Sequence, residues 1–203
     1  ENYKPVIHID PDWPLVKLGE VVEVNRNSIN PKEIYKDEEF FYVDISSVEN
    51  GTGNISFDQR LSGFDAPSRA RRVAEIGDVL LSTVRPNLKA FAYIADIPKD
   101  VVFSTGFGIL TPSEKILGKY LYYLLLNDFL QDQMISRMGR GSYPSINQKD
   151  VKNLLIPLPT IKDQHKIVDE IDENMSLIEI NKVLMDRFEE KIDDRIKRLW
   201  EEE

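Results

Sequence analysis

The spacing of apolar residues changes along this 203-residue chain, and the change divides it into two parts. Up to residue 112 the apolar residues come in short runs separated by glycine, proline and asparagine, which is typical of strands and turns. From residue 113 the spacing becomes helical, and from residue 163 it settles into a four-three series. We therefore predict a mixed α/β body, with a twisted and mostly antiparallel sheet plus helices, followed by one long helix.

Within the body, the pattern predicts several elements in order. Residues 13–27 are expected to form a short amphipathic helix that leads into a strand. Aromatic and β-branched residues predict strands at 38–48 and 101–112, and two strands within 70–96 that are split at Arg85-Pro86-Asn87. Turns are expected at 49–58 and at Gly77-Asp78, and Gly106 and Gly108 indicate a bulge or a close backbone approach. Residues 113–138 are predicted to be helical, with a break near Gly118.

The C-terminal segment carries a heptad repeat that only Lys182 and Glu189 interrupt. Such a repeat favours a coiled-coil seam. About 40 residues at about 1.5 Å each give a rod of about 60 Å, which needs a second helix to cover its seam. The alternative is a helix folded back on the body. We place the body at 1–160 and the rod at 161–203, with Pro157 and Pro159 ending the body. The predicted dimerisation residues are Val168, Ile171, Met175, Ile178, Met185, Ile192, Ile196 and Leu199.

Charge is distributed unevenly along the chain. The net charge is −9, which by itself argues against binding to nucleic acid. Residues 60–150, however, carry 12 basic and 9 acidic side chains, a net charge of +3, and their arginines are clustered. A local basic face would allow DNA binding despite the acidic total. The alternative is an acidic protein with ordinary surface arginines.

Residue types needed for catalysis are scarce. There is no cysteine, and neither His8 nor His165 has a metal-ligand companion at useful spacing. Gly106-Phe107-Gly108 lacks the third glycine of a dinucleotide-binding loop. The Glu189-Glu190-Lys191 triplet lies on the predicted rod, where charges of both signs are ordinary. We expect no catalytic site, no cofactor and no metal on this chain.

We also expect a soluble protein. The first residues show neither the basic nor the apolar region of a signal peptide, and the strongest apolar run, 120–126, is too short to cross a bilayer. A chain without cysteine is compatible with the cytoplasm.

Four polar loops of the positive segment carry the side chains that contact phosphates and base edges in DNA complexes. Ser104, Thr105 and Asn147 are equally typical of turns or helix caps, and Arg85 is also suited to anchoring a buried carboxylate. The candidate DNA-binding residues are Arg69, Arg71, Arg85, Asn87, Lys89, Ser104, Thr105, Arg140, Ser142, Tyr143, Asn147 and Gln148.

Five phrases in order carry a resemblance that covers nearly the whole chain. They are WPLVKLGEVVEV, GDVLLSTVRPNLKAFAYI, FSTGFGILTP, KYLYYLL and GRGSYPSINQKDVKNLLIPLPTIKDQHKIVDEID. The sequence resembles the target recognition domain and following conserved helix of type I restriction–modification specificity subunits. The most specific parts are the GDVL-ST-RPN segment and the IPLP junction that precedes Gln164.

The resemblance implies a subunit without catalytic activity that reads half of a split sequence in double-stranded DNA. Long helices of this family pair as a coiled coil, fix the spacer between half-sites and dock two modification (methyltransferase) subunits. The resemblance further implies that the complex methylates adenine with S-adenosylmethionine, and that a restriction subunit adds cleavage that uses ATP and Mg²⁺.

In one respect the chain departs from the family pattern. Typical members carry two recognition domains and two conserved helices in tandem, whereas this sequence has one of each. Two copies are therefore expected to form a homodimer through the rod and to read a palindromic split site. The heptad repeat leaves open whether the helices pair parallel or antiparallel. Two other functions remain as alternatives: a nuclease or methyltransferase, although no Pro-Pro of an adenine methyltransferase signature occurs, and a coiled-coil scaffold whose globular end binds protein.

Overall fold

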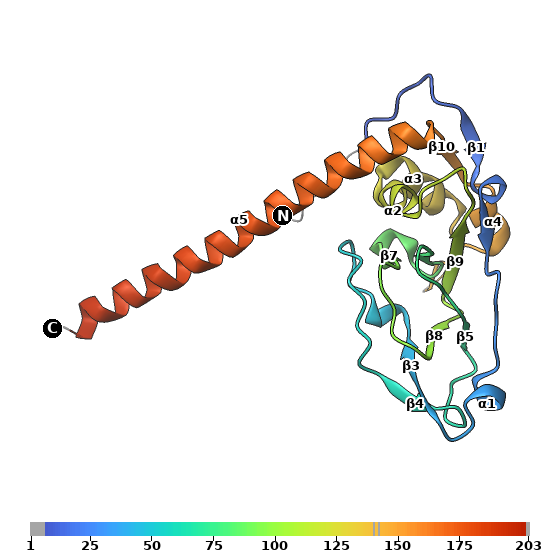
Figure 1. Cartoon of the computed structure of the whole chain (residues 1–203), viewed down its shortest axis with the longest axis horizontal. Helices are drawn as coiled ribbons and strands as arrows, with labels where there is room; N and C mark the ends of the chain where they lie inside the picture. Colours follow the sequence, from blue (N-terminus) through green and yellow to red (C-terminus); the bar gives the residue numbers. More distant parts are fainter. Residues whose placement is uncertain (1–6, 140, 142, 202–203) are drawn as a thin grey trace.

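A computed structural model of the chain describes residues 7–139, 141 and 143–201. It consists of a mixed α/β body and one long helix, α5 (Ile161–Glu201), that projects away from the body (Figure 1). The rod is therefore extended, and the alternative of a helix folded back on the body is wrong.

Two four-stranded sheets and a two-stranded sheet form the β structure of the body. Their orders are β2-β9-β6-β7, β4-β3-β8-β5 and β1-β10. All pairings are antiparallel except that of β3 with β8, so the predicted mostly antiparallel character is confirmed. The strands are β1 (Leu15–Lys17), β2 (Val22–Val24), β3 (Glu39–Val43), β4 (Arg60–Ser62), β5 (Ala70–Arg72), β6 (Val79–Ser82), β7 (Phe91–Tyr93), β8 (Val101–Ser104), β9 (Phe107–Pro112) and β10 (Leu155–Pro157).

The single strand predicted at 101–112 is in fact two strands that belong to different sheets. β8 pairs with β3 and β5, whereas β9 pairs with β2 and β6. The chain crosses between the sheets at Thr105-Gly106, and a Cβ added at Gly106 would lie 2.6 Å from Cδ1 of Ile45. The close backbone approach expected at this glycine is confirmed, and it marks the change of sheet.

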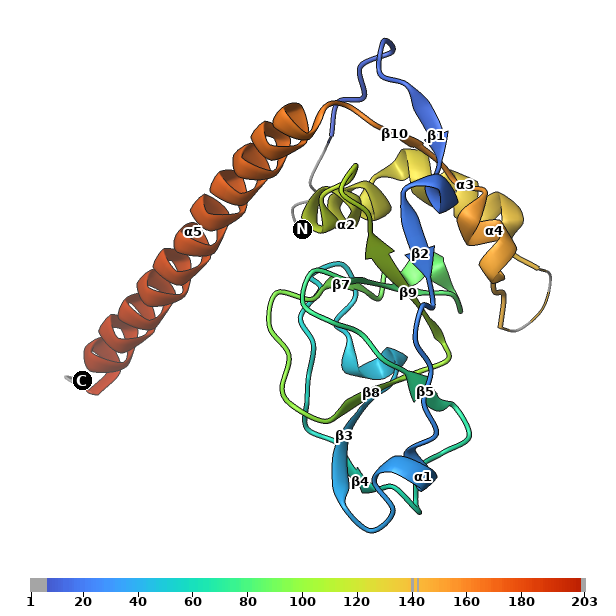
Figure 2. The ribbon, with the colours of Figure 1, turned by 45° about the vertical axis from the view of Figure 1, so that its right-hand side comes forward.

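Helices gather at the end of the body that carries the rod, whereas the β4-β3-β8-β5 sheet lies at the far end with α1 (Figure 2). The α-helices besides α5 are α1 (Pro31–Ile34), α2 (Gly118–Leu126), α3 (Asp128–Arg137) and α4 (Gln148–Lys152), and the short 3-10 helices are η1 (Leu18–Glu20), η2 (Ile45–Ser47) and η3 (Pro86–Leu88). Helix α2 is the centre of the largest apolar core, because its residues from Tyr120 to Leu126 are all buried.

Two helix predictions need correction. Residues 15–20 form β1 and η1 rather than an amphipathic helix, because β1 pairs with β10 from 140 residues further along the chain. The helix predicted at 113–138 begins only at Gly118, where a break was expected, and it is interrupted a second time at Asn127. The Asn127 side chain accepts a hydrogen bond from the Phe129 backbone N–H at 2.9 Å and so starts α3.

The root of α5 is part of the body. Thr160 caps the helix, because its hydroxyl accepts from the Asp163 N–H at 3.3 Å and donates to the Asp163 carboxylate at 2.7 Å. The Gln164 side chain is fully buried, and Val168 and Ile171 join the core around α2. The body therefore extends past the predicted boundary at residue 160, and these two seam positions are buried by the chain's own body.

Gln164 satisfies three backbone groups at this root. Its Oε1 accepts from the Leu117 N–H at 2.9 Å, and its Nε2 donates to the carbonyls of Lys115 and Pro159, both at 3.0 Å. One amide thus joins the start of the rod to the segment before α2 and to the end of the β10 segment.

We predict that Gln164→Leu lowers the free energy of unfolding by about 3 kcal/mol, because a buried polar group left without a partner costs roughly 1–3 kcal/mol. Urea denaturation followed by circular dichroism measures the change. The matched control is Glu170→Gln on the exposed side of α5, which is expected to change the value by about 0.5 kcal/mol or less. An equal stability of the two variants would contradict the role of the Gln164 amide.

Candidate nucleic-acid interface

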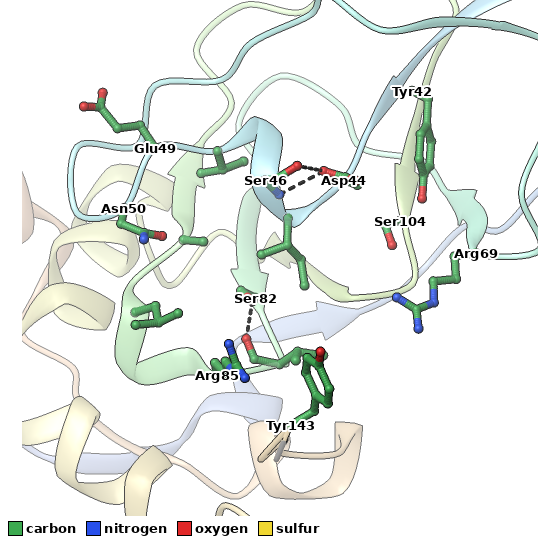
Figure 3. Close-up of a pocket in the computed structure, with 15 residues that line it drawn as sticks. Tyr42, Asp44, Ser46, Glu49, Asn50, Arg69, Ser82, Arg85, Ser104 and Tyr143 are labelled. Carbon is green, nitrogen blue, oxygen red and sulfur yellow. Dashed lines mark hydrogen bonds between the residues drawn. The ribbon is translucent and has the colours of Figure 1, made fainter.

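The ends of three strands open on one cavity. β3 and β8 run parallel, with Val43 opposite Phe103, so the residues that follow them emerge at the same edge of the sheet. β6 of the other sheet ends nearby at Ser82. The cavity has a volume of about 610 Å³ (Figure 3). Its lining residues are Tyr42, Asp44, Ile45, Ser46, Val48, Glu49, Asn50, Arg69, Ser82, Val84, Arg85, Leu88, Ala90, Ser104 and Tyr143.

Arg85 is fixed by its backbone at the mouth of this cavity. It adopts a left-handed conformation with φ 48° and ψ 53°, which few residues other than glycine adopt. Its N–H donates to the Pro144 carbonyl at 2.8 Å, and its guanidinium carbon lies 4.7 Å from the centre of the Tyr143 ring. These contacts join the loop after β6 to the 139–147 loop and hold an exposed guanidinium against an aromatic face.

Arg69 approaches the cavity from a different loop (Figure 3). Its side chain is exposed, and its carbonyl accepts from the Thr105 N–H at 2.8 Å, which ties it to the crossing between the sheets. Ser104 is buried there, and its hydroxyl accepts from the Gly106 N–H at 3.2 Å. Ser104 thus holds the turn, and Thr105 is exposed beside it.

Two carboxylates in the cavity lining, Asp44 and Glu49, were not predicted from the sequence, and both follow the end of β3. The Asp44 carboxylate caps η2 by accepting from the Ser46 N–H at 2.9 Å and the Ser46 hydroxyl at 2.6 Å. Hydrogen bonds from the side chains of Thr52 and Asn54 lower the pKa of Glu49, so that carboxylate is ionised. Both carboxylates are therefore engaged by hydrogen bonds within their own segment of the chain.

Four candidates lie outside the lining of this cavity and have other contacts. Lys89 is the clearest correction, because its Nζ donates to the Leu126 carbonyl at 2.8 Å at the end of α2 and lies 3.7 Å from the Asp128 carboxylate. Arg71 lies in β5 and donates from Nε to the Ser68 carbonyl of the preceding loop at 3.2 Å. The other two, Asn147 and Gln148, lie at the start of α4.

Asn147 is a helix cap. Its Oδ1 accepts from the N–H groups of Lys149 and Asp150 at 2.8 and 3.0 Å, which bears out the alternative reading of this residue. Gln148 donates to the Val24 carbonyl at 3.1 Å and accepts from the Asn25 side chain at 3.2 Å. Asn147 therefore starts α4, and Gln148 holds it against the body.

Three candidates complete the set. Asn87 is exposed in η3, next to the cavity loop but outside its lining. Arg140 and Ser142 lie outside the described residues.

The part of the chain that the structure describes contains neither a cluster of metal-binding residues nor a helix that could span a membrane. Residues 7–139, 141 and 143–201 contain no group of three or more histidine, cysteine or acidic residues that would hold a metal ion. Among the same residues, no helix has the length and apolar character needed to cross a membrane.

Comparisons with known proteins agree on one family. Residues 11–189 match the family described as Type I restriction modification DNA specificity domain. The HindI type I restriction enzyme specificity subunit of Haemophilus influenzae is 28% identical over 174 residues, 84% of this chain and 37% of that protein. The MjaVIII specificity subunit of Methanocaldococcus jannaschii is 25% identical over 190 residues, 89% of this chain and 44% of that protein.

Solved structures give the same result. The HsdS subunit from Thermoanaerobacter tengcongensis is 34% identical, with a TM-score of 0.76 over 88% of this chain and 46% of that chain. A chain from a solved structure that concerns complex assembly and conformational transition of the type I R-M system is also 34% identical, with a TM-score of 0.74. This chain therefore belongs to the type I restriction–modification specificity subunits, and it spans less than half the length of the curated relatives named here.

We predict that Asn147→Ala lowers the free energy of unfolding by about 1 kcal/mol, the usual cost of removing a helix N-cap. Thermal or urea unfolding measures the loss. Asn87→Ala is the matched control, since Asn87 is exposed and its side chain caps no helix. If Asn147→Ala altered DNA sequence preference and left stability unchanged, Asn147 would be a base-reading residue rather than a cap.

Proposed function

We propose that this chain is a non-catalytic specificity subunit whose body reads one half of a split DNA target through the cavity loops. The observation that carries the proposal is the convergence of Arg69, Arg85 and Tyr143, from three loops far apart in the sequence, on one cavity. Family membership supports it, because the matched relatives are specificity subunits. We place the chain in the cytoplasm, bound to double-stranded DNA and to the other subunits of a type I complex.

In this proposal the chemistry belongs to partner subunits. Modification subunits methylate adenine with S-adenosylmethionine, and a restriction subunit cleaves with ATP and Mg²⁺. This chain supplies position, since guanidinium groups suit phosphates and guanine edges, while the Asn50 amide in the cavity lining suits the edge of adenine. Its net charge of −9 means that the basic loops alone must provide attraction to DNA.

We predict that Arg85→Ala and Arg69→Ala each weaken DNA binding by about 1–3 kcal/mol. Loss of a phosphate contact would weaken binding equally for all sequences and would reduce the salt dependence of the affinity. Loss of a base contact would instead relax the sequence preference at one position. Duplexes selected from a random library by the parent chain provide the ligand, and fluorescence anisotropy at several salt concentrations provides the measurement.

Arg187→Ala on the exposed rod is the matched control and should bind as the parent does. Unchanged affinity in both cavity variants would remove the cavity loops from the interface. An affinity of the parent chain that does not depend on salt would instead favour the scaffold alternative, because phosphate contacts release counterions.

The exposed part of the rod carries two apolar stripes. The remaining described seam comprises Met175, Ile178, Met185, Ile192 and Ile196, of which only Ile178 is half-buried. Leu199 lies in α5, in a part for which no side chain is described. A second stripe, absent from the sequence analysis, comprises Leu177, Ile180, Leu184 and Phe188, all exposed. At 3.6 residues per turn the stripes lie about 115° apart around the helix, too far for one partner helix to cover both.

We propose that the seam pairs with the helix of a second copy and that the second stripe docks a modification subunit. The predicted consequence is that Met185→Glu with Ile192→Glu converts a dimer into a monomer, because each carboxylate would be buried in the apolar seam. Light scattering measures the mass of the intact chain. Leu184→Glu on the second stripe is the control and should leave the dimer intact while weakening capture of the modification subunit. A parent chain that is monomeric at high concentration would overturn the homodimer and the palindromic target.

A further inference from the structure

A second polar contact, made by Asp172, holds the rod further along α5 than Gln164. Both oxygens of the Asp172 carboxylate are engaged by α2: the Lys119 Nζ lies 2.6 Å from Oδ2, and the Tyr123 hydroxyl donates to Oδ1 at 2.5 Å. Burial, together with Asp172 itself, raises the pKa of the Tyr123 phenol, so that this group is a proton donor at neutral pH.

The contacts of Gln164 and Asp172 lie where they can fix the direction of α5. Gln164 and Asp172 are eight residues apart, about 12 Å along a helix, and two fixed points define an axis. Val168 and Ile171 between them make apolar contacts, which resist separation but have no directional preference. From Glu179 to Lys197 every side chain of α5 is exposed, so the body does not pack against the rod further out. A contact of charge still reaches the rod there, because local hydrogen bonds and then the attraction of Lys182 lower the pKa of Glu49.

A small change of angle at this root becomes large at the far end. About 29 residues separate Asp172 from Glu201, roughly 44 Å of helix, so a tilt of about 10° displaces the end by about 8 Å. That displacement is roughly two base pairs at 3.4 Å per step. A body that reads DNA while its rod is held by a partner therefore needs a fixed angle.

We propose that Lys119, Tyr123 and Asp172 form a clamp that sets the angle between the body and the rod and thereby selects the spacer length between half-sites. The consequence for DNA rests on the proposed function, whereas the effect on the angle does not. Asp172 is a positioning residue here. An ion pair that is partly exposed contributes little to stability, so the clamp acts mainly on orientation.

The absence of cysteine permits a direct test of the angle. Spin labels at Asp132→Cys on α3 and Asp186→Cys on the rod, both exposed positions, report the distance between body and rod by double electron–electron resonance. We expect one narrow distance distribution in the parent, a broader or shifted one in Asp172→Ala, and intermediate ones in Tyr123→Phe and Lys119→Met. The two single-contact variants also answer the question if Asp172→Ala does not fold.

Glu173→Ala is the matched control, because it removes an exposed carboxylate from the next position of the same helix. It should leave the distance distribution of the parent unchanged. Labels diluted with unlabelled chain exclude distances between copies. The clamp is refuted if Asp172→Ala and both single-contact variants give the distribution of the parent.

A second measurement tests the spacer. Duplexes that carry the selected half-site twice, with spacers varied in single steps around the preferred length, are compared for affinity. We expect the parent to bind the duplex with the preferred spacer about tenfold or more tightly than a duplex whose spacer differs by roughly two base pairs. Simultaneous binding of both half-sites depends on their geometry. Asp172→Ala should lose most of this preference and Glu173→Ala should retain it.

The outcomes separate the two proposals. A parent chain that binds no DNA would end the proposed function and leave the distance measurement as the test of the clamp. A broadened distance distribution with an unchanged spacer preference would overturn the role in spacer selection.

Discussion

The junction between the body and α5 is the constraint on which the rest of the structure depends. A helix of 41 residues packs against the body only over its first turns, so its orientation is determined mainly within those turns. The fully buried Gln164 side chain makes this possible, because its amide pairs with three backbone groups that the packing of α2 and β10 would otherwise leave without partners. A purely apolar junction would bury as much surface and would leave the angle free.

The same junction explains why β1 is a strand. β10 is the last strand of the body, and β1 pairs with it along its whole length. Leu18 and Tyr120 pack below this pair, and the Tyr120 hydroxyl donates to the Pro157 carbonyl at 3.0 Å. The N-terminal segment is thus held beside the start of the rod, and the helical spacing of its apolar residues gives way to a pairing partner 140 residues away.

How much could be read from the sequence depends on the range of the interactions. The heptad repeat of α5, the turn at Gly51 and Gly53 and the break at Pro86 are local, and each was predicted. Asn127 was missed because an asparagine within a helical pattern of apolar residues does not by itself indicate a cap. It acts as a cap only where one helix ends and a second helix starts in a new direction. The change of sheet at Gly106 was missed because both strands are apolar, and nothing local tells which sheet each joins.

The candidate site was predicted in its residue types and less well in its members. Arginine, serine and tyrosine in loops of a positive segment pointed to one region, and Arg69, Arg85, Ser104 and Tyr143 line one cavity there, while their role in DNA binding stays a prediction. Lys89, Asn147 and Gln148 have the same chemistry but are bound to helix ends and to Val24. A cation or an amide in a loop contacts whatever unpaired carbonyl or N–H lies nearest, and only the fold decides whether that group belongs to the chain itself or to a ligand.

The source of a second recognition body decides the symmetry of the target. The split site of the proposed function needs two bodies, and the sequence of this chain, which spans less than half the length of the relatives named above, provides one. Two identical copies related by a two-fold axis present identical reading surfaces and thus require a palindrome, whereas two different bodies in tandem do not. In the symmetric case both copies have the same angle between body and rod. Any change of this angle at Asp172 would therefore alter the separation of the half-sites twice, once in each copy. The proposed clamp, with two hydrogen bonds on one carboxylate, would then be more strongly needed than in a tandem subunit, where the two ends can differ and compensate.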